Sequence, residues 1–179
     1  MSIKKEMQDA INDQINAEMF SAYLYLSMAS WFEDEDLPGF GNWMRCQYME
    51  ETMHAMKFFN FLNERGGRAE LKPIEGPDIN WNSYQEAFAA VVAHEEYISE
   101  RINKLVSLSR KLEDYATESF LMWYVDEQVE EEDEANKILA KLKRLKEDSN
   151  GLLRFDSEMA GRAVAAAAVP TILDQALVD

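Results

Sequence analysis

The sequence predicts an all-α protein: four long helices form a bundle, a long connection crosses over between the second and third, and a short fifth helix follows. Two observations carry this prediction. Apolar residues recur every three or four positions along four long stretches, which is the spacing of one helix face. The 179-residue chain also holds only 7 Gly and 4 Pro, a composition typical of a compact and mostly helical protein.

The first two helices are expected over residues 4–33 and 40–65. A turn containing Pro38-Gly39 separates them, and Gly66-Gly67 ends the second helix. Each helix has one face that is apolar apart from a few polar residues. This face holds Met7, Ile11, Gln14, Glu18, Ser21, Tyr25, Met28 and Phe32 on the first helix, and Phe40, Met44, Gln47, Glu51, His54, Phe58 and Phe61 on the second.

The third helix is expected to begin at the capping-box pattern of residues 83–86, and the fourth to cover roughly residues 116–147. Their core faces hold Tyr84, Phe88, Val91, Glu95, Ile98, Ile102, Leu105 and Leu112, and Phe120, Tyr124, Glu127, Glu131, Ala135, Ile138, Leu142 and Leu145. We therefore assign residues 1–148 to the bundle. Residues 149–179 are assigned to a short C-terminal helix and an Ala-rich tail.

The connection at residues 66–82 determines the topology. Its Pro73, Gly76 and Pro77 indicate extended chain. Seventeen such residues can span about 55 Å, whereas a 26-residue helix is about 39 Å long. The connection can therefore return along the whole bundle, so that the second and third helices run parallel. The short turns within each helix pair make antiparallel hairpins.

Composition excludes several classes of partner. The formal net charge is -16, from 34 acidic and 18 basic residues, and this charge attracts cations and repels nucleic acid and anionic membranes. A lone Cys46 cannot form an intrachain disulfide. The sequence shows neither a signal-peptide core nor a stretch long enough to span a bilayer, so a cytoplasmic location is expected.

Four acidic residues interrupt the core faces: Glu18, Glu51, Glu95 and Glu131. Apolar residues lie one turn before and after the first three of them. Buried carboxylates without partners cost several kcal/mol each. The four faces offer no inward Lys or Arg, so bound cations are the expected compensation. Glu51 and His54 lie one helical turn apart, and oxygen ligands with one imidazole favour iron or manganese.

The hairpin register predicts that these residues meet. Glu18 and His54 each lie 18 positions from a turn centred near residue 36, and Glu95 and Glu131 each lie 18 positions from a turn near residue 113. One mid-bundle level should therefore hold all four carboxylates and His54. Glu127 and Gln128 are expected beside them.

Other polar residues near this level are mostly expected to have no role in metal binding. A lone Glu on a helix usually faces solvent, and this interpretation is kept for Glu132 and Asp133. For Glu130 and Glu134 both interpretations stay open. A surface position is favoured for His94. Tyr25 is either a core tyrosine or a phenol that donates a hydrogen bond, or an electron, near a metal pair.

The chain resembles the bacterial non-haem ferritins at residues 17–18, 23–25, 50–55, 94–95 and 120–131. The resemblance implies a ferritin-like fold and a di-iron site. Glu18, Glu51 and His54 would bind one iron, and Glu51 would bridge to a second iron held by Glu95 and Glu131, with Gln128 close by. A third, weaker site would use Glu50, Glu127, Glu130 and the shared Glu131.

The resemblance also implies ferroxidase activity on Fe(II) with O2 or peroxide, and a hollow 24-subunit cage for the ferric mineral. Bacterioferritins are the nearest alternative, but Glu130 stands where their second histidine is expected and Thr52 follows Glu51, so no haem is expected. Further alternatives are a di-iron oxygenase or peroxidase, a DNA-protecting mini-ferritin and a metal-free structural bundle.

Overall fold

The computed structural model describes residues 2–146 and 148–163. The predicted bundle is confirmed, including its long crossover and its fifth helix. The five helices are α1 (Lys5–Asp34), α2 (Pro38–Glu64), α3 (Tyr84–Lys111), α4 (Tyr115–Leu145) and α5 (Ser149–Met159).

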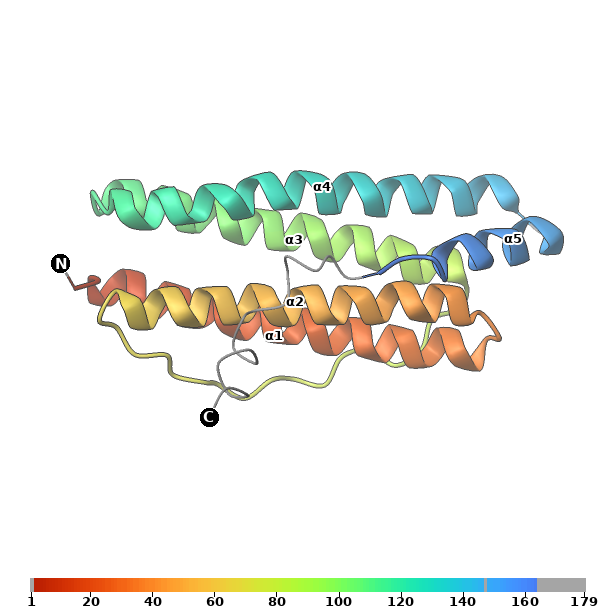
Figure 1. Cartoon of the computed structure of the whole chain (residues 1–179), viewed down its shortest axis with the longest axis horizontal. Helices are drawn as coiled ribbons and strands as arrows, with labels where there is room; N and C mark the ends of the chain where they lie inside the picture. The colour runs from red at the N-terminus through yellow and green to blue at the C-terminus, as the bar shows by residue number, and fades with distance from the viewer. Residues whose placement is uncertain (1, 147, 164–179) are drawn as a thin grey trace, which may run out of the picture.

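The four long helices form two antiparallel hairpins that lie side by side (Figure 1). One hairpin contains α1 and α2, and the other contains α3 and α4. The crossover runs along the whole length of the first hairpin, so α2 and α3 point in the same direction. Three side chains of α1 fasten it: Asn12, Asn16 and Ser27 donate hydrogen bonds to its backbone carbonyls.

The helix starts follow from local chemistry. Ser83 caps α3, because its hydroxyl accepts a 3.1 Å hydrogen bond from the Glu86 backbone amide. The Glu86 carboxylate returns to Asn82 and not to Ser83, one residue earlier than the capping-box pattern predicts. Helix α2 begins at Pro38 and not at residue 40, because proline suits the first turn, where its missing N–H leaves no hydrogen bond unmade.

The apolar core consists of two separate clusters. One contains Phe32, Phe40, Trp43 and Phe88 and extends to α5. The other, toward the opposite end of the bundle, contains Met7, Phe58, Ile102 and Tyr124. Between them lies a belt of buried polar residues at mid-height, including Glu18, Ser21, Gln47, Glu51, His54, Glu95, Gln128 and Glu131.

Helix α5 is joined to the start of α2. The Asp156 carboxylate accepts a 2.9 Å hydrogen bond from the Phe40 backbone amide, which caps α2 from another helix. Gly39 makes this contact possible, since an added Cβ would lie 1.7 Å from the Asp156 carbonyl oxygen. The tail at 164–179 lies outside the described residues. The domain division at residue 148 stays a prediction.

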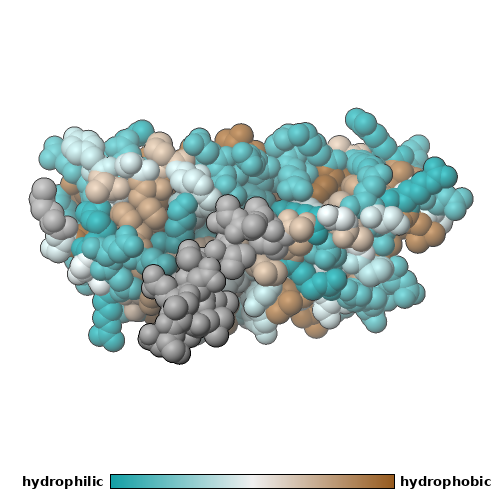
Figure 2. All heavy atoms as spheres, in the orientation of Figure 1, coloured by the Kyte–Doolittle hydropathy of each residue, from teal (hydrophilic) through white to brown (hydrophobic). Residues whose placement is uncertain are grey.

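The surface is mostly hydrophilic, with apolar side chains at several separate places on the face that Figure 2 shows. The most exposed of the large apolar side chains include Leu71 and Ile79 of the crossover, Tyr115 and Val129. Over the described part of the chain, no helix is both long and apolar enough to cross a membrane.

Candidate metal centre

Glu18 of α1 meets Glu51 and His54 of α2 at the middle of the first hairpin. One ligand atom from each residue lies within 4.8 Å of the others. The three residues are 1%, 2% and 5% exposed. Glu51 and His54 are neighbours because they are three residues apart on one helix, and His54 Nδ1 lies 3.5 Å from Glu51 Oε2.

Glu95 of α3 and Glu131 of α4 are buried at the same level in the second hairpin. Glu95 accepts hydrogen bonds from the Tyr25 hydroxyl and, at 3.2 Å, from Gln128 Nε2. Glu131 accepts a 2.9 Å hydrogen bond from Gln47 Nε2. All the donors are neutral, so their hydrogen bonds leave the carboxylate charge uncompensated.

Burial raises the pKa of all four carboxyl groups, and their mutual repulsion raises it further for three of them. The pKa values of Glu18 and Glu51 lie well above the usual range, each raised by burial and by another carboxylate. Burial also raises the pKa of Glu95, although the Tyr25 and Gln128 hydrogen bonds oppose this. Burial and the Glu95 charge raise the pKa of Glu131 to about 8. A bound cation would remove both causes.

This donor set fits one or two divalent or trivalent cations. Glu18 Oε2 and Glu51 Oε2 are buried and have no hydrogen-bond partner among the described residues. An unpaired buried carboxylate oxygen is unfavourable, so both atoms have unused capacity for a positive ligand. Oxygen donors with one imidazole match iron or manganese, as the sequence suggested.

The three further residues expected at a third site do not form one cluster. Glu127 is half-buried, with Oε1 3.8 Å from His54 Nε2. Glu130 is exposed. Glu50 is paired with Arg162, whose Nη2 lies 2.7 Å from its Oε2. The same Arg162 atom lies 3.5 Å from Glu134, and the guanidinium covers the Trp43 ring at 4.6 Å.

Sequence reasoning missed Gln14 and Gln47 as partners of the buried carboxylates, whereas it expected Gln128 beside them. Gln14, Gln47 and Gln128 each donate to one buried carboxylate: Glu18, Glu131 and Glu95 respectively. A signal was present, because Gln14 and Gln47 lie one helical turn before an inward Glu on the same face. Arg162 was missed because it follows α5, where no helical pattern predicts its direction.

The predicted surface position of His94 is wrong. Its ring is half-buried between α3 and α1, with Nε2 2.8 Å from the Ser21 hydroxyl and the ring edge-on to Tyr25 at 6.2 Å. Burial lowers the pKa of His94 to about 4, so the ring is neutral at pH 7. Glu132 also departs from the expected solvated position. It is half-buried and bonded to Ser99, whereas Asp133 is exposed as predicted.

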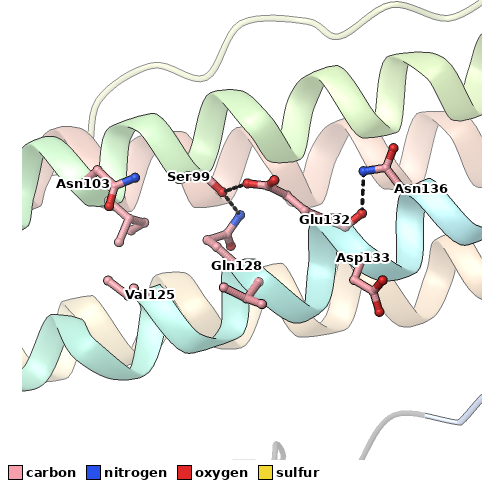
Figure 3. Close-up of a pocket in the computed structure, with 9 residues that line it drawn as sticks. Ser99, Asn103, Val125, Gln128, Glu132, Asp133 and Asn136 are labelled. Carbon is pink, nitrogen blue, oxygen red and sulfur yellow. Dashed lines mark hydrogen bonds between the residues drawn. The ribbon is translucent and has the colours of Figure 1, made fainter.

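A groove of about 420 Å³ between α3 and α4 lies beside the second pair of carboxylates. Figure 3 shows Gln128 in it, near Ser99 and Glu132, with Val125 and Asn103 at one end. Gln128 lines the groove and also donates a 3.2 Å hydrogen bond to Glu95, so it connects the groove with that carboxylate.

An all-α bundle whose core holds buried carboxylates and a Glu-x-x-His pair belongs to the class of ferritin-like bundles. The comparisons agree. The family model of the ferritin-like domain matches residues 8–145. The bacterial non-heme ferritin of Staphylococcus aureus is 37% identical over 160 residues, which cover 89% of this chain and 96% of that protein.

Solved structures give the same result. An open-pore ferritin from the archaeon Archaeoglobus fulgidus is 50% identical, with a TM-score of 0.90 over 91% of this chain and 100% of that one. An engineered closed form of the same ferritin gives a TM-score of 0.90 at 50% identity, over 91% of this chain and 99% of that one. The chain belongs to the ferritin family, whose members store iron.

Proposed function

We propose that this protein oxidises Fe(II) at a pair of sites inside each subunit and stores the ferric product. One observation carries the proposal: buried Glu18, Glu51 and His54 converge within 4.8 Å with two carboxylate oxygens unpaired. Iron is the substrate and cargo. Glu18, Glu51 and His54 would hold the first ion, and Glu51 would share the second with Glu95 and Glu131.

The two proposed iron sites differ in their ligands. The first has an imidazole and two carboxylates, which give firm binding. The second has no imidazole and lies near the neutral amide of Gln128, so product iron can leave it more easily. Anionic oxygen ligands favour Fe(III) over Fe(II), because they stabilise the higher charge more strongly.

The electron balance needs two iron ions. Two Fe(II) give up one electron each, and O2 with two protons is reduced to hydrogen peroxide. Alternatively, hydrogen peroxide takes up the two electrons and two protons, its O–O bond breaks, and two water molecules form. Tyr25 donates a hydrogen bond to Glu95, so its phenol is fixed beside the second site. We assign it the role of holding that carboxylate in place or lending an electron.

Iron leaving the centre would pass the outer carboxylates Glu127, Glu130 and Glu50. With the shared Glu131 they are proposed as a third and weaker site, whose ligands would come together only when iron binds. The family relation supports a 24-subunit cage that stores the mineral. No haem is proposed, and a Soret band that scales with protein would contradict this. A cytoplasmic location is proposed from the sequence.

A di-iron oxygenase remains the second candidate, because the groove beside Gln128 offers space near the proposed second iron. Its lining combines polar side chains, such as Ser99 and Glu132, with the apolar side chains of Ile102, Val125 and Val129. Particle mass separates the candidates, since a cage of several hundred kDa supports storage and a dimer supports an oxygenase.

The test adds Fe(II) to the purified protein in air and follows ferric absorbance, with particle size measured on the same sample. We expect fast oxidation in the unaltered chain and loss of the fast phase in His54→Ala and Glu18→Ala, with cage size retained. Glu64→Ala is the control, because Glu64 is exposed near the end of α2. A fast phase that survives in His54→Ala would overturn the site assignment.

A further inference from the structure

The orientation of the Gln14 amide is determined by a group outside the metal centre. Gln14 is buried on α1, and its Nε2 donates a 2.7 Å hydrogen bond to Glu18 Oε1. Its Oε1 accepts a 2.9 Å hydrogen bond from Arg101 Nε. A guanidinium can only donate hydrogen bonds, so the amide oxygen must face Arg101 and the amide NH2 must face Glu18.

Arg101 is itself held in place. Its Nη2 donates to the Asp13 carbonyl at 2.9 Å and its Nη1 donates to the Tyr97 hydroxyl at 3.1 Å. The first bond connects α3 to α1, the second lies within α3, and Arg101 lines an open pocket on the outside of the bundle. The hydrogen-bonded series therefore runs from the surface, through Arg101 and Gln14, to Glu18.

The two oxygens of Glu18 are thereby made unequal. Oε1 is occupied by Gln14, whereas Oε2 is buried without a partner among the described residues. We propose that Arg101 and Gln14 are positioning residues that make Glu18 bind the first metal ion through Oε2 alone. This inference rests on the proposed function, because it assumes that Glu18 is a metal ligand.

Gln47 provides the contrast. It donates in the same way to Glu131, but its own Oε1 has no hydrogen-bond partner among the described residues. No cation therefore fixes the direction of the Gln47 amide. Arg101 therefore restrains the amide at the first metal site alone, and binding of Glu18 through one oxygen would keep the coordination number of the first metal ion low.

Cobalt(II) serves as the probe, because its visible absorption weakens when the number of ligands rises. The unaltered cage and the variants Arg101→Ala, Arg101→Lys, Gln14→Leu and Arg101→Ala/Gln14→Leu are each titrated with cobalt(II). In Arg101→Ala the Gln14 amide loses its anchor to α3 and can move away from Glu18 Oε1. Glu18 can then bind through both oxygens, and the visible bands of the first cobalt equivalent should lose intensity. Gln14→Leu should show the same loss.

Two comparisons separate positioning from a plain contact between helices. The double variant should match Gln14→Leu, because Arg101 acts through Gln14, and Arg101→Lys should restore the spectrum. Arg110→Ala, which removes an α3 arginine paired with Glu118, is the control and should leave the spectrum unchanged. A lower melting temperature with an unchanged spectrum in Arg101→Ala would overturn the inference.

The result also separates this inference from the function on which it rests. If the unaltered chain fails to bind cobalt(II) stoichiometrically, the metal centre and the inference are both wrong. If it binds cobalt(II) and the double variant loses more intensity than Gln14→Leu does, only the positioning role is wrong.

Discussion

The four carboxyl groups at mid-height are almost fully removed from water. The hydrogen-bond donors to Glu18, Glu95 and Glu131 are neutral, so the metal-free protein can reduce the cost of burial by keeping protons on these groups. Protonation and metal binding are therefore alternatives at the same oxygens, which makes the stability of the protein depend on pH.

The metal-free protein should lose stability as pH rises. The folded-state pKa values of these carboxyls are raised, so the folded state holds more protons than the unfolded state above about pH 4.5, and each added pH unit favours unfolding. We expect the melting temperature of the chelator-treated protein to fall between about pH 5 and about pH 8, the pKa of Glu131.

Glu131→Gln removes one raised carboxyl and should flatten this pH dependence, whereas Glu130→Gln at an exposed neighbour should not. Added Zn(II) should reverse the trend, because metal ligands bind more tightly when deprotonated. A melting temperature that rises with pH in the metal-free protein would contradict the argument.

Arg162 is paired with Glu50, a residue of the proposed third site, and would compete there with a cation. Both side chains are largely buried, at 17% and 16% exposed, and Nη1 of Arg162 has no partner among the described residues. Arg162→Ala should therefore strengthen binding of a third divalent ion by about fivefold, the equivalent of roughly 1 kcal/mol for one ion pair. Calorimetric titration with Zn(II) measures this, and Arg162→Lys, which keeps a cation there, should show little change.

At the scale of the elements, the contact between α2 and α5 depends on one missing side chain. In Gly39→Ala the new methyl group would collide with the Asp156 backbone, so α5 must move and α2 loses its cap from Asp156. We expect a loss of about 2–4 kcal/mol of stability, measured by chemical denaturation, because a cap and part of the Phe155 packing are lost together. Gly76→Ala is the control, since that added methyl group meets nothing within 4 Å.

The sequence predicted the helices because their periodicity is strong, and it predicted the level of the carboxylates because equal distances from a turn imply equal height. It did not predict the side-chain directions of Arg101 and Arg162, which depend on packing between helices that are distant in sequence. His94 was misplaced for the same reason: Ser21 and Tyr25 of α1 cover a ring that the α3 pattern alone puts outside the core face.

At the scale of the whole molecule, the two hairpins contribute unequally to the centre. The first brings Glu18, Glu51 and His54 together within a single turn-linked pair of helices. The second brings Glu95 and Glu131 to the same level, and the long crossover allows α3 to run parallel to α2. The ligand set of the two proposed iron sites is therefore complete only after the two hairpins have packed against each other.

The division of the apolar interior into two clusters has a dynamic consequence. Without metal, the helical turns at mid-height hold polar and acidic side chains in place of apolar packing and contribute little cohesion. Each end of the bundle should therefore open as its own cooperative unit. Native-state hydrogen exchange on the chelator-treated protein should show two distinct opening free energies, and Zn(II) should merge them; a single value in both samples would contradict this. Iron loading would then decide whether the subunit unfolds in one step or in two.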